Sequence, residues 1–202
     1  YAVKTKSPHV MLSGAGAEEF AKEQGLEMVE DNMYFATPKT MEWIEKLKQE
    51  SKKNGTVGCV VLDKQGNLTA GTSTGGMFKK RWGRIGDSPV IGAGTYADNN
   101  SCAVSCTGHG EYFIRHAVAF DVCARYKYLK ESVEKAADYI IHTELNTNAG
   151  NGGLIAVDKL GNIAMPYNSG GMFRGFLYKE KGRPEIKKGC GIEKKIVVVG
   201  EK

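Results

Sequence analysis

Long hydrophobic runs are missing from this chain of 202 residues. No apolar stretch approaches the roughly 20 residues that a membrane-spanning helix needs, so we expect no membrane partner. Hydrophobic residues make up 41% of the chain and charged residues 25%, which is typical of a soluble globular protein. The length is sufficient for one well-buried core and short for two, so we predict one structural domain overall.

Paired disulfide and metal-ligand motifs are missing as well. The five cysteines are an odd number, include no C-x-x-C pair and follow no visible secretory leader. Four of them lie in apolar segments, where thiols behave as small buried hydrophobes: Cys59, Cys102, Cys106 and Cys123. This usage predicts a reducing, cytoplasmic location. The four histidines lack ligand spacing among themselves or with the cysteines, so we expect no metal and no cofactor.

A charge excess large enough to identify a partner is missing too. The net charge of +5 comes from dispersed Lys and Arg, with small clusters at 79–81 and 187–188. Without aromatic interleaving or a nucleic-acid motif, a solvated surface is the simpler interpretation, so we expect no nucleic-acid partner. The glycine-rich segments at 14–16 and 108–110 do not complete a phosphate-binding motif and are interpreted as tight turns.

The first 55 residues alternate short elements and turns. We predict a strand-like segment at 9–12, a helix at about 15–24 that Gly25 ends, and a helix that starts at Thr37-Pro38 and runs through Leu47. The polar stretch 51–55 follows. It is the best candidate for an exposed linker, and exposed linkers are where chains are cut.

From Val57 onward the pattern changes to short strands. We predict strands at 57–62, 68–73, 90–96 and 102–105, then a helix at about 111–128, a second helix with an apolar stripe from 133 to 141, and strands at 154–157 and 163–167. Strands, two helices and strands again predict an α+β domain with helices against antiparallel sheet.

One internal repeat is visible. Residues 63–68 are echoed by 158–163, and residues 74–78 by 169–173, at one constant offset. Each copy predicts a β-hairpin whose turn is the Asp-Lys-x-Gly-Asn segment. The second copy has Asn151 at the position equivalent to Thr56, so a purely structural role at that position does not require the hydroxyl.

Thr56 stands where the linker meets the first predicted strand, in Gly55-Thr56-Val57-Gly58. A threonine is a self-sufficient nucleophile only at the start of a chain, where its own amine takes the hydroxyl proton. If Thr56 is the reactive group, the chain must therefore be cut between Gly55 and Thr56.

Arg84 and Asp87 stand three residues apart in the Gly- and Pro-containing loop 81–89, so both can face one pocket. Arginine binds an α-carboxylate and aspartate an α-ammonium, which predicts a receptor for an amino acid. An ordinary salt bridge within the loop remains the alternative.

The segment Thr107-Gly108-His109-Gly110-Glu111 has the form of a strand-to-helix corner. Backbone amides and a hydroxyl at such a corner are suited to an oxyanion hole, while Glu111 fits a helix-dipole role. His109 is interpreted as structural, because an N-terminal threonine already carries a base, an α-amine with a pKa of about 7.7–8.0.

Together with 72–76 and 92–98, these motifs resemble the plant-type asparaginase/isoaspartyl peptidase family of N-terminal-nucleophile hydrolases, over nearly the whole chain. The resemblance implies an αββα sandwich of two stacked antiparallel sheets between helical layers. It also implies autoproteolysis between Gly55 and Thr56. Residues 1–55 would be the C-terminal part of the α subunit with the linker, and 56–202 the β subunit, in an (αβ)₂ assembly.

The resemblance also assigns roles to single residues. Thr56 would be the nucleophile and Thr74 its hydrogen-bonding neighbour, Thr107 and Gly108 the oxyanion hole, and Arg84, Asp87 and Gly110 the substrate-binding groups. The implied reaction hydrolyses asparagine and β-aspartyl dipeptides and releases aspartate. The alternatives are a glycosylasparaginase, which acts on GlcNAc-Asn, and an unprocessed relative that binds amino acids without hydrolysing them.

The front of the family pattern has no counterpart in these 202 residues. The family begins with a strand, a His-Gly-Gly-Ala-Gly-like segment and a loop that binds a structural sodium ion. We therefore expect this chain to lack that ion's loop and a central strand of the sheet.

Overall fold

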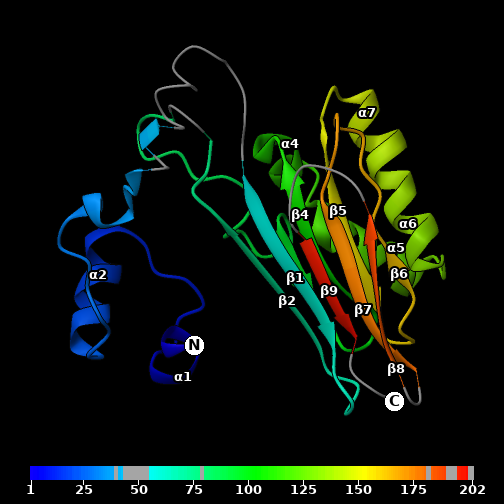
Figure 1. Ribbon diagram of the computed structural model, residues 1–202, viewed down its shortest axis with the longest axis horizontal. Helices are drawn as coiled ribbons and strands as arrows, with labels where there is room; N and C mark the ends of the chain where they lie inside the picture. The colour runs from blue at the N-terminus through cyan, green and yellow to red at the C-terminus, as the bar shows by residue number, and fades with distance from the viewer. Residues whose placement is uncertain (39–40, 43–54, 78–79, 181–182, 190–194, 200–202) are drawn as a thin grey trace. The chain divides into compact units, whose positions relative to one another are not determined.

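The computed structural model describes residues 1–38, 41–42, 55–77, 80–180, 183–189 and 195–199. The chain divides into two compact units, Tyr1–Lys52 and Lys53–Lys202, which are described separately. The first unit contains the helices α1 (Ala2–Lys6) and α2 (Gly14–Glu23) and the 3₁₀ turn η1 (Asn32–Phe35) (Figure 1). The predicted helix at 15–24 is confirmed, and Gly25 ends it with a φ of 66°.

Of the two remaining predictions in the first unit, one is wrong and the other falls mostly outside the described residues. The strand predicted at 9–12 is wrong, because this segment is irregular. Its apolar side chains Val10 and Met11 are exposed rather than packed on a sheet. The helix predicted from Thr37 through Leu47 lies mostly outside the described residues.

The second unit is built on two sheets (Figure 1). One sheet, sheet A, has the order β2-β1-β9-β7-β8 and consists of β1 (Thr56–Leu62), β2 (Leu68–Thr74), β7 (Arg174–Glu180), β8 (Arg183–Gly189) and β9 (Lys195–Val199). The other, sheet B, has the order β3-β4-β5-β6 and consists of β3 (Thr95–Ala97), β4 (Cys102–Gly108), β5 (Gly152–Asp158) and β6 (Ile163–Ala164).

Sheet A differs from the expected pattern in the direction of its central strand pairings. The strand β9 lies between β1 and β7 and pairs with both. Both pairings are parallel, so sheet A is mixed and not purely antiparallel as the αββα description implied. Sheet B is antiparallel throughout its ladders.

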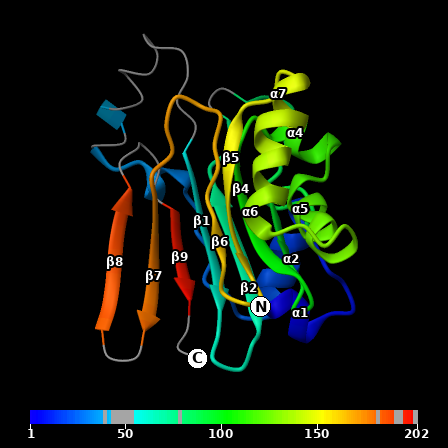
Figure 2. The same ribbon diagram turned by 90° about the vertical axis from the view of Figure 1, so that its right-hand side faces the viewer.

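The sheets and helices of this unit form successive layers. An apolar cluster that includes Val60, Leu62, Ala103 and Ile155 fills the space between sheet A and sheet B. Helices cover the other face of sheet B (Figure 2): α4 (Gly110–Arg115), α5 (Val118–Tyr128), α6 (Val133–Tyr139), the π-helical turn η2 (Ile140–Glu144) and α7 (Leu145–Thr147). The predicted α+β class is confirmed.

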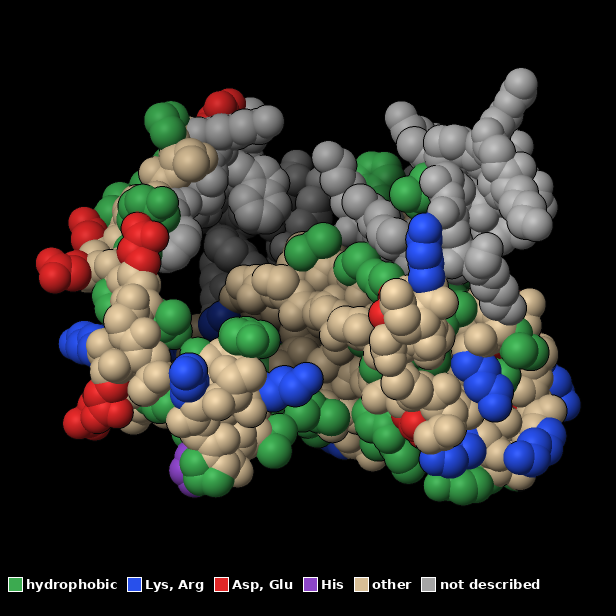
Figure 3. Space-filling model, turned by 90° about the horizontal axis from the view of Figure 1, so that it is seen from below, with side chains coloured by type: hydrophobic (Ala, Val, Ile, Leu, Met, Phe, Trp, Pro, Cys, Tyr) green, Lys and Arg blue, Asp and Glu red, His purple; other side chains and the backbone are tan. Residues whose placement is uncertain are grey.

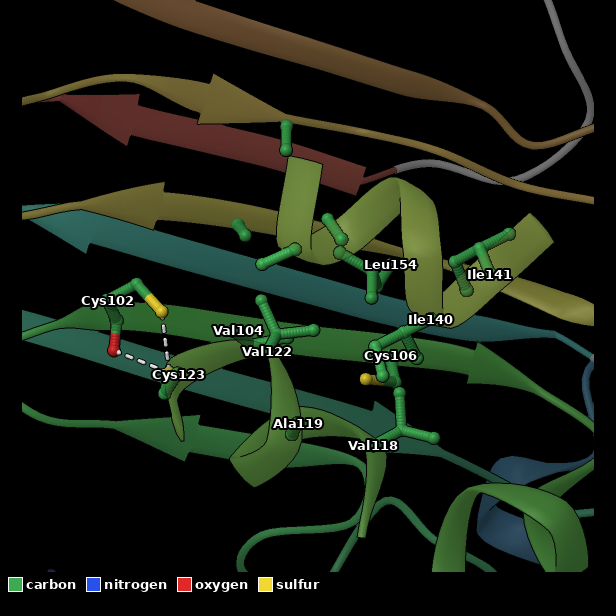
Figure 4. Packing of buried hydrophobic residues seen from close by; sticks show 14 of the residues in the cluster. Cys102, Val104, Cys106, Val118, Ala119, Val122, Cys123, Ile140, Ile141 and Leu154 are labelled. Carbon is green, nitrogen blue, oxygen red and sulfur yellow. Dashed lines mark hydrogen bonds between the residues drawn. The ribbon is translucent and has the colours of Figure 1, made fainter. Parts of the chain in front are cut away.

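The core between sheet B and the helices contains the buried cysteines. Cys102 at the start of β4 and Cys123 on α5 have their sulfur atoms 2.6 Å apart, and the Cys123 thiol donates to the Cys102 carbonyl at 3.2 Å (Figure 4). Cys106 is also fully buried, whereas Cys59 is only half-buried and Cys190 lies outside the described residues. The prediction that thiols in apolar segments are buried hydrophobes is therefore confirmed for Cys102, Cys106 and Cys123 and only partly met at Cys59.

The helix predicted at 111–128 is divided into α4 and α5. Ala117 adopts a left-handed conformation with a φ of 45°. The amide of Ala119 donates to the carbonyl of Ala93 at 3.1 Å instead of continuing a helical ladder. The apolar periodicity of the sequence indicates a continuous helix here. It carries no information about a hydrogen bond from the helix to a carbonyl in a distant loop.

Two strand predictions were too long. In place of a strand at 90–96, the chain makes turns in which the amides of Val90 and Gly94 both donate to the Asp87 carbonyl, and β3 begins only at Thr95. The strand predicted at 163–167 ends at Ala164, with one isolated bridge further on.

Charged side chains of both signs are visible on the face of the molecule drawn in Figure 3. Figure 3 shows lysine and arginine side chains lying among acidic and hydrophobic ones on the face that it draws. Among the described residues, no helix is both long and apolar enough to cross a membrane.

Candidate active site

Thr56 is the first residue of β1 and pairs with Thr74, the last residue of β2. Its hydroxyl donates to the Thr74 hydroxyl at 3.3 Å, and Thr74 donates to the carbonyl of Gly55 at 2.9 Å. The amide of Gly76 also donates to the Thr74 hydroxyl at 3.0 Å. A hydroxyl has one donor and two acceptor positions, so Thr74 is fully occupied. The result is a directed chain of hydrogen bonds from Thr56 to the carbonyl of the Gly55–Thr56 bond.

The hairpin turn sets this register. Asp63 Oδ1 accepts hydrogen bonds from the amides of Gln65 and Asn67 at 2.9 and 2.7 Å, and Gly66 has a φ of 85°. Because the turn fixes which residues face each other, it also brings Thr56 opposite Thr74.

The second copy of the repeat forms its turn in the same way. Asp158 Oδ1 accepts from the amides of Leu160 and Asn162 at 2.8 and 2.9 Å, and Gly161 has a φ of 90°. The two hairpins predicted from the repeat, β1–β2 and β5–β6, are confirmed.

Two side-chain contacts define how β2 of sheet A lies on β4 of sheet B. The Leu68 amide, where β2 begins, donates to the side chain of Asn99, just before β4 begins, at 2.7 Å. Further along both strands, the hydroxyls of Thr72 and Ser105 are 2.7 Å apart. The two strands therefore run in the same direction across the gap between the sheets.

Thr74 and Thr107 lie two residues beyond this hydroxyl pair, each on its own strand. Side chains two residues apart share a face of a strand, so both threonines face the space between the sheets at the same end. Thr107 is 6% exposed. The structure thus brings the predicted oxyanion segment to the end of the sandwich that holds Thr56.

Gly108 ends β4 at a point where two strands approach closely. Gly108 and its partner Gly152 have φ values of 149° and 153°. A Cβ on Gly108 would collide with the carbonyl of Asn151, and a Cβ on Gly152 with the carbonyl of Thr107. The conformation of the predicted oxyanion corner therefore depends on glycine on both strands.

Asn168 braces this corner and was missed by the sequence analysis. Its side-chain oxygen accepts from the Gly152 amide at 2.8 Å, and its side-chain nitrogen donates to the carbonyls of Gly150 and Ile141 at 3.1 Å. The Asn168 side chain thereby connects the start of β5, which lies beside Gly108, to the π-helical turn η2. The repeat could have drawn attention to it, because Asn168 aligns with Ser73 just before the repeated Gly-Gly pair.

Arg84 makes its ion pair with Glu111, a partner that the sequence analysis did not assign. Its Nε and Nη2 atoms donate to the two carboxylate oxygens of Glu111 at 2.9 and 2.8 Å. These hydrogen bonds lower the pKa of Glu111 to about 2, and they raise the pKa of Arg84 above its ordinary value, with further support from the charge of Asp87. Glu111, in the first turn of α4, therefore also holds the guanidinium of Arg84 in place, in addition to the helix-dipole role that we predicted.

Gly110 separates Arg84 from Asp87. A Cβ built on Gly110 would lie 2.7 Å from Asp87 Oδ1 and 3.0 Å from Arg84 Nη2. Asp87 is 6% exposed. The three residues predicted to bind the substrate are therefore together in one place, and the absence of a side chain at Gly110 is what leaves room between them.

His109 lies at the edge of this group. Its side chain is about half exposed, its Nε2 is 3.6 Å from Glu111 Oε2, and its ring meets the ring of Tyr112 edge-on at 5.4 Å between centroids. These contacts suit the structural role that we predicted. Among the described residues, no group of three or more His, Cys, Asp or Glu side chains could hold a metal ion.

Comparison with known proteins identifies the family. The family described as asparaginase matches residues 1–185, and the chain belongs to it. The chain is 46% identical over 190 residues to an isoaspartyl peptidase of Salmonella typhimurium, an alignment that covers 87% of this chain and 60% of that protein. An isoaspartyl peptidase of Escherichia coli is 42% identical over 203 residues, covering 89% and 63%.

A eukaryotic relative gives the same result. The isoaspartyl peptidase/L-asparaginase of Mus musculus is 43% identical over 182 residues, covering 84% of this chain and 54% of that protein. The chain thus spans about 60% of the length of the bacterial relatives that it matches.

Proposed function

We propose that the chain is an autoprocessing threonine amidohydrolase that releases aspartate from asparagine and from β-aspartyl dipeptides. The observation that carries this proposal is the directed hydrogen-bond chain from the Thr56 hydroxyl through Thr74 to the Gly55 carbonyl. A threonine needed only for packing would not require its hydroxyl to be aligned with the peptide bond that precedes it.

These hydrogen bonds also supply a proton route for the autoproteolytic cleavage of the Gly55–Thr56 bond. As Thr56 Oγ1 attacks the Gly55 carbonyl carbon, its proton passes to Thr74 Oγ1, and the Thr74 proton passes to the carbonyl oxygen. As the C–N bond breaks, that proton passes from the hydroxyl to the departing nitrogen, which becomes the Thr56 amine, and Gly55 is left as an ester on Thr56 Oγ1. Water hydrolyses that ester, giving a Gly55 carboxylate and a β subunit that begins with Thr56.

Turnover reuses the freed residue. The α-amine of Thr56, with an ordinary pKa of about 7.7–8.0, takes the hydroxyl proton while Oγ1 attacks the side-chain carbonyl of the substrate. Thr107 and the Gly108 amide would stabilise the oxyanion. Ammonia or the amine of the leaving amino acid departs, and water then releases aspartate from the acyl-enzyme.

The substrate class follows from the Arg84, Asp87 and Gly110 group. A guanidinium beside a nearly buried carboxylate suits a ligand that carries both an α-carboxylate and an α-ammonium. Glu111 occupies Nε and Nη2, so we assign the Nη1 side of Arg84 to the substrate carboxylate. The names of the relatives, isoaspartyl peptidase and L-asparaginase, support the same class. We also propose the cytoplasmic location and the (αβ)₂ assembly.

Parallel turnover assays test this function. Purified chain is offered asparagine, a β-aspartyl dipeptide and GlcNAc-Asn, and aspartate release is measured for the unmodified protein and for Thr56→Ala. We expect release from the first two substrates and none from the variant. Preferential cleavage of GlcNAc-Asn would indicate a glycosylasparaginase instead, and normal turnover by Thr56→Ala would refute the mechanism.

A further inference from the structure

Arg174 is a cation that the mechanism above does not use. It is the first residue of β7, and its guanidinium carbon lies 4.5 Å from the centroid of the Tyr167 ring. Its Nη1 atom is buried and has no hydrogen-bond partner among the described residues. A buried donor on a charged group costs free energy when it is left unsatisfied, so this nitrogen calls for an acceptor.

The pairing of sheet A places Arg174 near the nucleophile's end of the sheet. Ile196 of β9 pairs with Cys59 on one side and with Gly175 on the other. Arg174 is therefore level with Gly58, two strands away, which corresponds to about 10 Å across the sheet. Because β1, β9 and β7 are parallel, β1 and β7 both begin at this end of the sheet.

The side chains of Arg174 and Thr56 point to the same face. Val60 on β1 is buried between the two sheets, and Phe176 on β7 packs against the same cluster. Thr56 is four residues from Val60 and Arg174 is two from Phe176, so the period of two places both on the face toward sheet B.

Tyr167 connects Arg174 to the oxyanion segment. Tyr167 forms an isolated bridge with Gly153, and Gly153 pairs with Thr107 on the neighbouring strand. A Cβ on Gly153 would lie 2.6 Å from the Tyr167 Cβ, so the missing side chain makes room for the tyrosine. The tyrosine on which Arg174 stacks is thus separated from Thr107 by the single strand β5.

We propose that Arg174 is a carboxylate-binding subsite on the leaving-group side of the scissile bond. Arg84 is assigned to the α-carboxylate of the aspartyl part, so Arg174, on the same inter-sheet face as Thr56, is available for a second carboxylate. A β-aspartyl dipeptide carries a second carboxylate on its leaving amino acid, whereas asparagine leaves as ammonia and carries none. A carboxylate oxygen would satisfy Nη1, and Arg174 would favour peptides over asparagine. The inference rests on the proposed function for the identity of the substrate.

A binding experiment tests the subsite without requiring turnover. The full chain carrying Thr56→Ala is titrated calorimetrically with β-aspartyl-leucine and with the same compound as its C-terminal amide. The two ligands differ only in the charge that Arg174 is proposed to bind. We expect the free acid to bind roughly tenfold to hundredfold more tightly than the amide, the range for a hydrogen bond to a charged group.

Substitution then assigns the difference to Arg174. In Thr56→Ala/Arg174→Gln the two ligands should bind equally, and Arg174→Lys should recover part of the preference. The matched control is Arg125→Gln, since Arg125 stacks on Tyr139 at 3.8 Å in the helical layer and should leave the preference unchanged. If Arg174→Gln does not fold, the ratio of acid to amide affinity measured with Arg174 intact still tests the subsite.

Three results would overturn the subsite: equal binding of acid and amide, a preference that survives Arg174→Gln, or no binding of either ligand. The proposed function fails separately. If the chain discriminates acid from amide but hydrolyses neither asparagine nor the dipeptide, the hydrolase proposal is wrong and the subsite stands. Hydrolysis of both without discrimination would refute the subsite alone.

Discussion

The guanidinium of Arg84 donates two hydrogen bonds to the carboxylate of Glu111, at 2.9 and 2.8 Å. Arg84 belongs to the loop after β2 and Glu111 to the first turn of α4, so the pair joins the loop to the corner that carries Thr107 and Gly108. A two-point contact fixes both the position and the rotation of the guanidinium. Glu111 therefore orients the group that is assigned to the substrate.

Glu111→Gln tests that orientation. A glutamine can accept only one of the two hydrogen bonds and carries no charge, so Arg84 gains freedom to rotate. We expect KM for asparagine to rise about tenfold with a much smaller change in kcat. Glu131→Gln is the matched control, because Glu131 accepts two hydrogen bonds from Arg125 at 2.8 and 3.3 Å in the helical layer. An unchanged KM in Glu111→Gln would remove Glu111 from this role.

The stability contribution of the Arg84–Glu111 pair depends on pH with a defined sign. The folded state lowers the pKa of Glu111 from 4.5 to about 2, mainly through the hydrogen bonds from Arg84. The folded state therefore favours the ionised form, and this contribution is fully present above pH 4.5 and is lost as the pH falls toward 2. The Tm difference between the unmodified chain and Glu111→Gln should be constant from pH 6 to 8 and shrink below about pH 4. A difference that grows in acid would contradict the assignment.

Gly110→Ala should damage substrate binding. The added Cβ would lie 2.7 Å from Asp87 Oδ1 and 3.0 Å from Arg84 Nη2, so one of the two groups must move. We expect kcat/KM to fall at least about tenfold, since misplacement of one charged contact has that effect. Gly71→Ala on β2 is the control, because a Cβ there meets nothing within 4 Å. Equal kinetics for both variants would show that the contact at Gly110 has no functional consequence.

Thr74→Val should slow the self-cleavage of the chain. The valine has nearly the same shape but neither accepts from Thr56 nor donates to the Gly55 carbonyl. Loss of a donor to a developing oxyanion lowers rates by about a hundredfold or more. The measurement is the rate at which the fragment beginning with Thr56 accumulates, and Thr74→Ser, which keeps the hydroxyl, should retain most of that rate. Cleavage of Thr74→Val at the full rate would separate Thr74 from the first cut.

The hairpins and the site around Thr56 could be predicted from the sequence because their signals are local. The turn residues Asp63 and Gly66 specify the β1–β2 register, and that register alone brings Thr56 opposite Thr74. The spacing of Arg84 and Asp87 likewise indicated that they share a location, and the structure has Gly110 between them.

The features that the sequence did not predict depend on contacts between distant segments. Glu111 was assigned to a helix dipole because its partner lies 27 positions earlier in the chain. The break at Ala117 and the strand β9 in the middle of sheet A depend on partners elsewhere in the fold, and periodicity carries no information about them. The position of Arg174 near the Thr56 end of sheet A depends on the parallel register of β1, β9 and β7, which the sequence does not reveal.

The central claim is that the Gly55–Thr56 bond is cut by Thr56 itself. Intact-mass spectrometry of the purified chain after incubation tests it most directly, with Thr56→Ala treated in parallel. The account predicts two fragments, the second beginning with Thr56, and a single uncut chain for the variant. A chain that remains intact, or a variant that is cut at the same bond, would contradict it.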